Sequence, residues 1–99
     1  MSIEGISQTD GRSTFNDTSI NGGTIDSGVF NGSAVNTGTV STTAVFNSRT
    51  VNEGTVTGAC VFTGTAENAG DVNVAIFAGN SINSGTVNVS GFFTQDSFN

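Results

Sequence analysis

Residues 44–62, which read AVFNSRTVNEGTVTGACVF, contain one full period of a repeat that runs through most of this chain. Every second residue from Ala44 to Phe62 belongs to one series, and the residues between them belong to another. Alternation with a period of two is typical of β-strands, whereas an amphipathic helix has a period of 3.6. Val, Ile, Thr and Phe also favour strands, and frequent glycines disfavour a helix. We therefore expect short strands throughout the repeat.

An Asn-x-Gly motif followed by two further residues, usually Thr-Val, recurs five times, at steps of 15, 16, 16 and 15 residues. A repeat of this kind cannot bury its apolar side chains alone, so it stacks on its neighbours. We predict an all-β, single-domain β-solenoid (a parallel β-helix) of about five to six coils, with strands about 4.8 Å apart. The copies are NGGTI (Asn21–Ile25), NTGTV (Asn36–Val40), NEGTV (Asn52–Val56), NAGDV (Asn68–Val72) and NSGTV (Asn83–Val87).

The period divides the chain into two parts. Residues 1–14 lie outside the repeat, and we interpret them as a lead-in that caps the solenoid or docks on a partner. Residues 15–99 form the solenoid. Its repeats are 15–29, 30–45, 46–61, 62–76 and 77–92, with a partial sixth at 93–99.

Equivalent residues of successive coils are expected to stack in columns that hold the molecule together and mediate assembly. Stacked amides can hydrogen-bond from coil to coil. Asn-x-Gly also indicates a turn, because both residues tolerate a left-handed backbone. The aromatic column is Phe15, Phe30, Phe46, Phe62, Phe77 and Phe93; the amide column is Asn21, Asn36, Asn52, Asn68 and Asn83; the aliphatic column is Ile25, Val40, Val56, Val72 and Val87. Two further aliphatic columns are Ile20, Val35, Val51 and Ile82, interrupted by Glu67, and Val29, Val45, Val61, Ile76 and Phe92.

The alternation places the apolar residues of a coil in two sets that cannot both be inside. Phe46 and Val56 fall on one side of the chain, and Val45 and Val51 fall on the other. If the alternation were reversed at a corner, the three aliphatic columns would point inward from three short faces, and the Phe column would be exposed. Without that change, some aliphatic columns point outward. In either arrangement we expect one apolar column to be buried against another chain, because monomers rarely expose large contiguous apolar patches.

The composition argues against several classes of partner. The net charge is −6, and Arg12 and Arg49 are the only cations, so the clustered Lys and Arg that bind phosphates are missing. The same shortage argues against an anionic membrane surface, and no apolar run approaches the length of a membrane span. We expect no nucleic-acid partner and no membrane insertion. The single Cys60 permits no internal disulfide, and we interpret it as a small buried residue.

The sequence contains no recognisable catalytic or metal-binding motif. It has no His, no Lys and one Cys, so the usual nucleophile–base pairs are missing. Its carboxylates fall at different positions of the repeat, unlike those of calcium-binding nonapeptide repeats. We expect no enzymatic activity, no cofactor and no metal. The Thr column could suggest ice binding, but Asp71 interrupts it, so this is the least favoured alternative.

Two segments carry a resemblance to known repeat proteins: FNGSAVN (Phe30–Asn36) and FAGNSIN (Phe77–Asn83), each followed by Thr or Ser and then Gly-Thr-Val. The repeat A-x-F-x-G-x-A-x-N-x-G-T-V resembles tandem repeats in fibre-like proteins of bacteriophages and in bacterial surface proteins, and more weakly those of autotransporter passengers. The resemblance implies a stacked β-coil fibre element and no catalytic residue. It also implies a location outside the cell or on a virion, although MSIEGISQTDGRS lacks the features of an ordinary secretory signal.

Unsealed ends of a solenoid promote association, because open strand edges pair with other chains. Phe92, Phe93 and Phe98 lie near the C-terminus without a charged cap, and we interpret them as candidate end-to-end contacts. A head-to-tail contact does not close on itself and produces a filament. We therefore expect a structural subunit that self-assembles into a fibre. The alternative is a trimeric fibre shaft or surface adhesin that binds glycans through its Asn and Thr faces.

Overall fold

The computed structural model describes residues 3–94 and Ser97, with the backbone alone for residues 3–13. All regular structure in this part of the chain is β, as predicted. The strands are β1 (Ile3–Phe15), β2 (Ile20–Phe30), β3 (Val35–Asn36), β4 (Thr39–Phe46), β5 (Val51–Asn52), β6 (Thr55–Phe62), β7 (Glu67–Asn68), β8 (Asp71–Phe77), β9 (Ile82–Asn83) and β10 (Thr86–Phe93).

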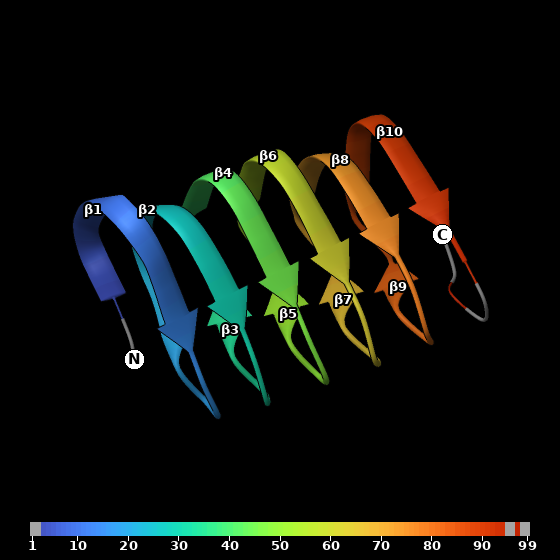
Figure 1. Ribbon diagram of the computed structural model, residues 1–99, viewed down its shortest axis with the longest axis horizontal. Helices are drawn as coiled ribbons and strands as arrows, with labels where there is room; N and C mark the ends of the chain where they lie inside the picture. Colours follow the sequence, from blue (N-terminus) through green and yellow to red (C-terminus); the bar gives the residue numbers. More distant parts are fainter. Residues whose placement is uncertain (1–2, 95–96, 98–99) are drawn as a thin grey trace.

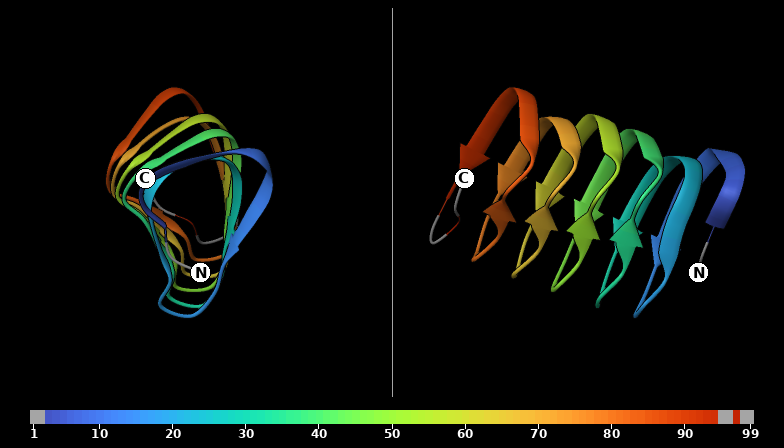
Figure 2. Two further views of the ribbon diagram at one scale, coloured as in Figure 1. Left: turned by 90° about the vertical axis from the view of Figure 1, so that its left-hand side faces the viewer. Right: turned by 180° about the vertical axis from the view of Figure 1, so that it is seen from behind.

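The strands wind into a parallel solenoid. Their order in the sheet is β10-β8-β6-β4-β2-β3-β5-β7-β9, with β1 added to β2, and the pairings are parallel. Successive windings lie side by side along the long axis of the molecule (Figure 1). Viewed along that axis, they superimpose into one three-cornered outline (Figure 2). The prediction of a single-domain β-solenoid with coils of about 16 residues is confirmed.

Each winding presents three outer faces, because the long strands bend in the middle. The first, which we call the short face, follows β3, β5, β7, β9 and the start of β2. The threonine face follows the first half of each long strand, and the valine face follows the second half. Their outward columns are Ile20, Val35, Val51, Glu67 and Ile82 on the short face; Thr24, Thr39, Thr55, Asp71 and Thr86 on the threonine face; and Val29, Val45, Val61, Ile76 and Phe92 on the valine face.

The Phe column lies inside the solenoid, and two aliphatic columns lie outside. Phe46 and Val56 are at most 1% exposed, whereas Val45 and Val51 are half-buried on the outer surface. The arrangement with three aliphatic columns inside and Phe exposed is therefore wrong. Alternation persists around most of each winding, and the narrow interior holds one aromatic, one aliphatic and one amide column beside columns of small residues.

The two repeats of 15 residues, 15–29 and 62–76, are one residue shorter than the others. The missing residue falls at the bend of the long strand. The register shifts between Ile25 and Ser27 in β2, and β8 is also one residue shorter than β6 across the same bend. Strand pairing continues on both sides of the shift. The deletion is therefore absorbed by a change of bend within a strand.

The glycines of Asn-x-Gly are required for close stacking. A Cβ on Gly54 would lie 2.1 Å from the carbonyl oxygen of Gly38 one winding earlier, and the other three windings give 2.0 to 2.3 Å. The expected left-handed backbone is instead in the tight turn after each Phe, which corrects the sequence interpretation. The residues with positive φ are Asp17, Gly32, Ser48, Gly64 and Gly79.

A buried amide column runs through the interior beside this corner. Asn52 donates a hydrogen bond from Nδ2 to Oδ1 of Asn68 at 2.8 Å, and its own Oδ1 accepts one from Nδ2 of Asn36 at 2.7 Å. Its second Nδ2 hydrogen bonds to the carbonyl oxygen of Gly54 at 3.3 Å. The same pattern joins Asn21 to Asn36 and Asn68 to Asn83. A side chain with these partners can be fully buried without leaving unpaired polar groups.

Replacing Gly54 by Ala tests the close approach at the corner. The added Cβ must push the windings apart at a point where the Thr55 N–H donates to the Gly38 carbonyl oxygen at 2.9 Å. We expect Gly54→Ala to lower the free energy of unfolding by about 3 kcal/mol, the upper range for overpacking. Chemical denaturation followed by circular dichroism measures it.

The control is Gly64→Ala in the exposed turn, where φ is +67° and the nearest backbone atom is 3.0 Å from the added Cβ. There left-handed strain of about 1–2 kcal/mol applies, and the Ser48 backbone has to move by only a few tenths of an ångström. An equal or larger loss for Gly64→Ala would contradict the stacking role of the Asn-x-Gly glycine.

Replacing Asn52 by Asp tests the amide column. An ionised carboxylate cannot donate to Oδ1 of Asn68, and burial disfavours its charge. We expect Asn52→Asp to lower the free energy of unfolding at pH 7 by about 3 kcal/mol, in the range for an uncompensated buried charge. Burial raises the folded-state pKa of the new carboxyl above its unfolded value of about 3.9. The loss is therefore full above the folded-state pKa and shrinks as pH falls through it.

Asn80→Asp, in an exposed turn, is the matched control and should change stability by less than about 0.5 kcal/mol. Denaturation curves between pH 4 and pH 8 would show the difference. A pH-independent loss for Asn52→Asp would rule out the buried-charge explanation.

Candidate functional site

The Phe column is a continuous stack of rings inside the solenoid. Neighbouring ring centroids from Phe15 to Phe93 are 4.6 to 4.8 Å apart, and the ring planes are 4° to 7° from parallel. Isolated aromatic pairs prefer offset or edge-to-face geometry. Here the spacing of hydrogen-bonded strands, about 4.8 Å, fixes the distance between the rings. The stack therefore transmits the axial spacing of the backbone to the side chains.

The aliphatic column lies across the interior from the rings, with small side chains beside them. Val40, Val56 and Val72 are at most 1% exposed, and Val87 in the last winding is only half-buried. The small-residue column beside the rings includes Gly28, Ala44, Cys60, Ala75 and Gly91. These residues leave room for the rings. A Cβ on Gly28 would already lie 2.9 Å from Cε1 of Phe30.

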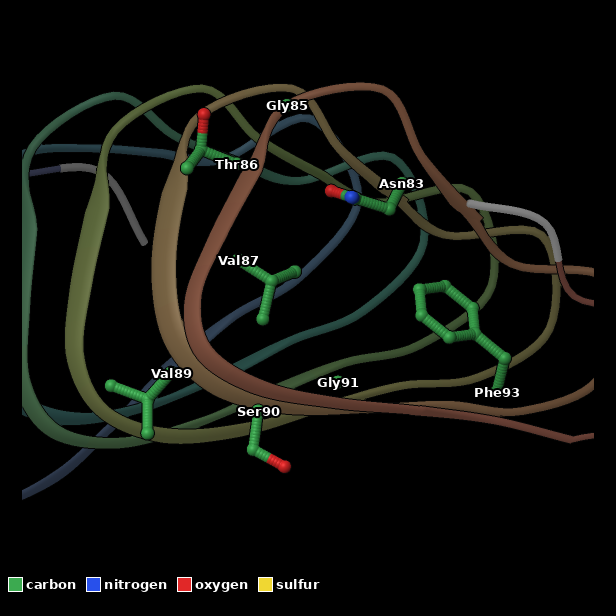
Figure 3. A pocket seen from close by; sticks show the side chains of 8 residues that line it. All are labelled: Asn83, Gly85, Thr86, Val87, Val89, Ser90, Gly91 and Phe93. Carbon is green, nitrogen blue, oxygen red and sulfur yellow. The ribbon is translucent and has the colours of Figure 1, made fainter.

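A cavity of about 400 Å³ opens at the C-terminal winding. Its walls include the last described member of each of the three inner columns, Asn83, Val87 and Phe93. Figure 3 shows these three side chains pointing into the space enclosed by the winding, whereas Ser90 points away from it. The cavity therefore lies where the side chains of one more winding would fit.

The opposite end of the solenoid has a different sequence. The backbone register of β1 on β2 continues the aromatic column to Phe15. In the amide column Ile3 stands opposite Asn21, and in the aliphatic column Gln8 stands opposite Ile25. Register shifts within β1 also interrupt its pairing, as in a β-bulge. The segment predicted to be a lead-in is thus a strand that adds a winding of altered sequence.

The three candidate end-to-end contacts do not share one environment. Phe93 lies at the open end, stacked on Phe77 with a centroid distance of 4.6 Å. Phe92 is 63% exposed and points sideways from the valine face. Phe98 lies outside the described residues. Of the two described residues, Phe93 is the one that lies in a position to contact a further winding.

The valine face was not singled out from the sequence as a site, although its column was recognised. Its aliphatic column is half-buried at Val29, Val45 and Val61 and becomes more exposed at Ile76, which is 42% exposed. Beside it runs a second outward column of Ser27, Thr43, Ala59, Val74 and Ser90. From β2 to β10 neither column contains a charged residue, whereas in β1 Arg12 stands opposite Ser27 and continues the second column. The signal in the sequence was the uncharged character of both columns taken together.

The described carboxylates do not converge on a site. Asp26 accepts a hydrogen bond from Oγ1 of Thr42 at 2.5 Å, and Glu67 accepts one from Oγ of Ser84 at 2.7 Å. Among the described residues, no group of three or more His, Cys, Asp or Glu side chains could hold a metal ion. In that same part of the chain, no helix is long and apolar enough to cross a membrane.

Cys60 is 2% exposed, and its thiol donates a weak hydrogen bond to the carbonyl oxygen of Val74 at 3.6 Å. Desolvation by burial raises the pKa of this thiol from 9.0 to about 12, so it is protonated and unreactive at neutral pH. The hydroxyls of Thr50 and Ser81 are also buried, without a hydrogen-bond partner among the described residues. Ala34 and Ala66 occupy the equivalent position in two other windings, and both are also buried. This position therefore requires a small side chain and not a hydroxyl.

No protein-family model, no curated protein and no solved structure matches this chain. Its function is therefore inferred from the inner columns, the open end and the outer faces.

Proposed function

We propose that this protein is a structural subunit that stacks head to tail into a fibre. The observation that carries the proposal is the cavity at the C-terminal winding. Inside the solenoid each winding covers the side chains of the one before it, so that Phe77 and Val72 are fully buried. Phe93 and Val87, the next members of the same columns, are half-buried, and among the described residues a winding covers them on one side only. A winding from a second molecule would complete their burial.

The backbone supports the same joining. β10 and β9 stand at the two ends of the strand order, so each has one edge without a strand partner within the described residues. Such edges are templates for pairing with another chain. The first winding of a second molecule runs in the same direction and begins the Phe column at Phe15. Phe15 of one copy would then stack on Phe93 of the next at the spacing that the five pairs within the molecule share.

We further propose that the fibre is extracellular or virion-associated. This rests on the resemblance of the repeat to those of phage fibre-like and bacterial surface proteins.

Adjacent substitutions in the last winding test the head-to-tail contact. Val87 lines the open end, and Asn88 is exposed on the outer surface. We expect Val87→Asp to raise the protein concentration needed for fibre formation at least about 100-fold, because a buried unpaired carboxylate costs several kcal/mol and 1.4 kcal/mol is a factor of ten. Asn88→Asp adds the same charge outside the joint and should form fibres like the unchanged protein.

Electron microscopy and pelleting assays measure fibre formation, and far-ultraviolet circular dichroism verifies that both variants remain folded. Three results would exclude head-to-tail assembly: no fibres from the unchanged protein at any concentration, normal fibres from folded Val87→Asp, or equal inhibition by both substitutions.

A further inference from the structure

The valine face differs from the other two outer faces in charge. The carboxylates whose side chains the structure describes lie elsewhere: Asp26 and Asp71 beside the threonine face, Glu67 on the short face, Glu53 at the corner that follows this face, and Asp17 in a turn. The protein has a net charge of −6, so two copies repel each other through most of their surface. From β2 to β10 the valine face carries no charged residue, and Arg12 of β1 lies at its N-terminal end, opposite Ser27. Two copies that touch over β2 to β10 therefore place no like charges opposite one another.

The side chains of this face are also of a suitable shape. Val45 and Val61 stack in one column, and Thr43 and Ala59 stack beside them in the second. Over β4 and β6, these small side chains at regular intervals on a parallel sheet make a low-relief surface, whereas the larger Ile76 and Phe92 follow in β8 and β10. Two sheets of this kind pack face to face at about 10 Å, with the inward-facing side chains interdigitated. The surface that best complements such a face is another copy of it.

The area of the face explains why one molecule can stay soluble. Four residues along each strand at about 3.3 Å, over the five windings from β2 to β10 at about 4.8 Å, give about 320 Å². This lies within the size of apolar patch that ordinary monomers tolerate, about 300–600 Å². It is less than half of the roughly 800 Å² per partner that a stable interface buries. A pair of single molecules is therefore held only weakly through this face.

In a fibre the same face repeats from subunit to subunit, and its contacts add. We propose that the valine face is a lateral interface through which two head-to-tail fibres of this protein pair, with a second copy of this chain as the partner. The inference rests on the proposed function for the fibre itself. Once two subunits of neighbouring fibres touch, the following contacts become intramolecular, so the paired state gains strength with fibre length. Axial growth thus precedes lateral pairing.

The test replaces apolar surface without changing side-chain shape. Val45→Thr with Val61→Thr keeps the branched shape and the strand preference but adds a hydroxyl to each side chain. The matched control, Thr39→Ser with Thr55→Ser, changes the threonine face in the same two windings. Mass per unit length is measured by scanning transmission electron microscopy. We expect paired fibres from the unchanged protein and the control, and a twofold lower mass per length from the valine-face variant.

Single fibres from the unchanged protein, or paired fibres from the valine-face variant, would overturn the inference. If no fibres form at all, head-to-tail assembly fails and the lateral contact is tested on single molecules. Val61→Cys and Thr55→Cys are then treated with a short bismaleimide at high protein concentration; the native Cys60 is buried and serves as the unreactive background. Dimers from Val61→Cys alone would support the lateral contact. Dimers from both variants, or from neither, would refute it.

Discussion

Neighbouring phenylalanine rings are stacked 4.6 to 4.8 Å apart, which is also the distance between hydrogen-bonded strands. This coincidence of two spacings is the constraint on which the rest of the structure depends. It requires each side chain to lie on its equivalent in the next winding. A position can therefore hold only a residue whose side chain packs well against an identical or similar side chain. Phe, Val and Asn meet this condition inside through stacking, close packing and amide hydrogen bonds. Gly54 meets it because nothing larger fits beneath the carbonyl oxygen of Gly38.

The period, the strand class and the membership of the columns could be read from the sequence, because a 16-residue step preserves alternation. Which set of apolar residues lies inside could not be read from hydrophobicity, since Val45 and Phe46 are both apolar. Interior volume decides that question. The small residues Ala44 and Cys60 share the parity of Phe46, and they were the available signal that this parity faces a narrow interior. The left-handed turn was missed because Ser48 stands where three other windings have Gly, so the motif is less regular than Asn-x-Gly.

The candidate site could be predicted only in part, for a related reason. Columns are a property of one chain and follow from its period, whereas an interface depends on which members of a column are left uncovered. Phe92 and Phe93 are adjacent in the sequence, yet Phe92 points outward from the valine face and Phe93 points into the interior at the open end. At the other end Ile3 and Gln8 replace the amide and the aliphatic residue of the regular winding. A joint between two copies would continue the aromatic column and interrupt the other two, and so would be weaker than the contacts within a molecule.

The buried amide column has a direction. Each Nδ2 donates to the Oδ1 of the winding that follows it toward the C-terminus, from Asn21 to Asn83. Amide groups carry dipoles of about 3.5 D, and dipoles aligned in this way add along the axis as they do in an α-helix. The molecule therefore has a small electric dipole along its axis. A fibre built from it would have two different ends, and subunits would bind to and dissociate from these two ends at different rates.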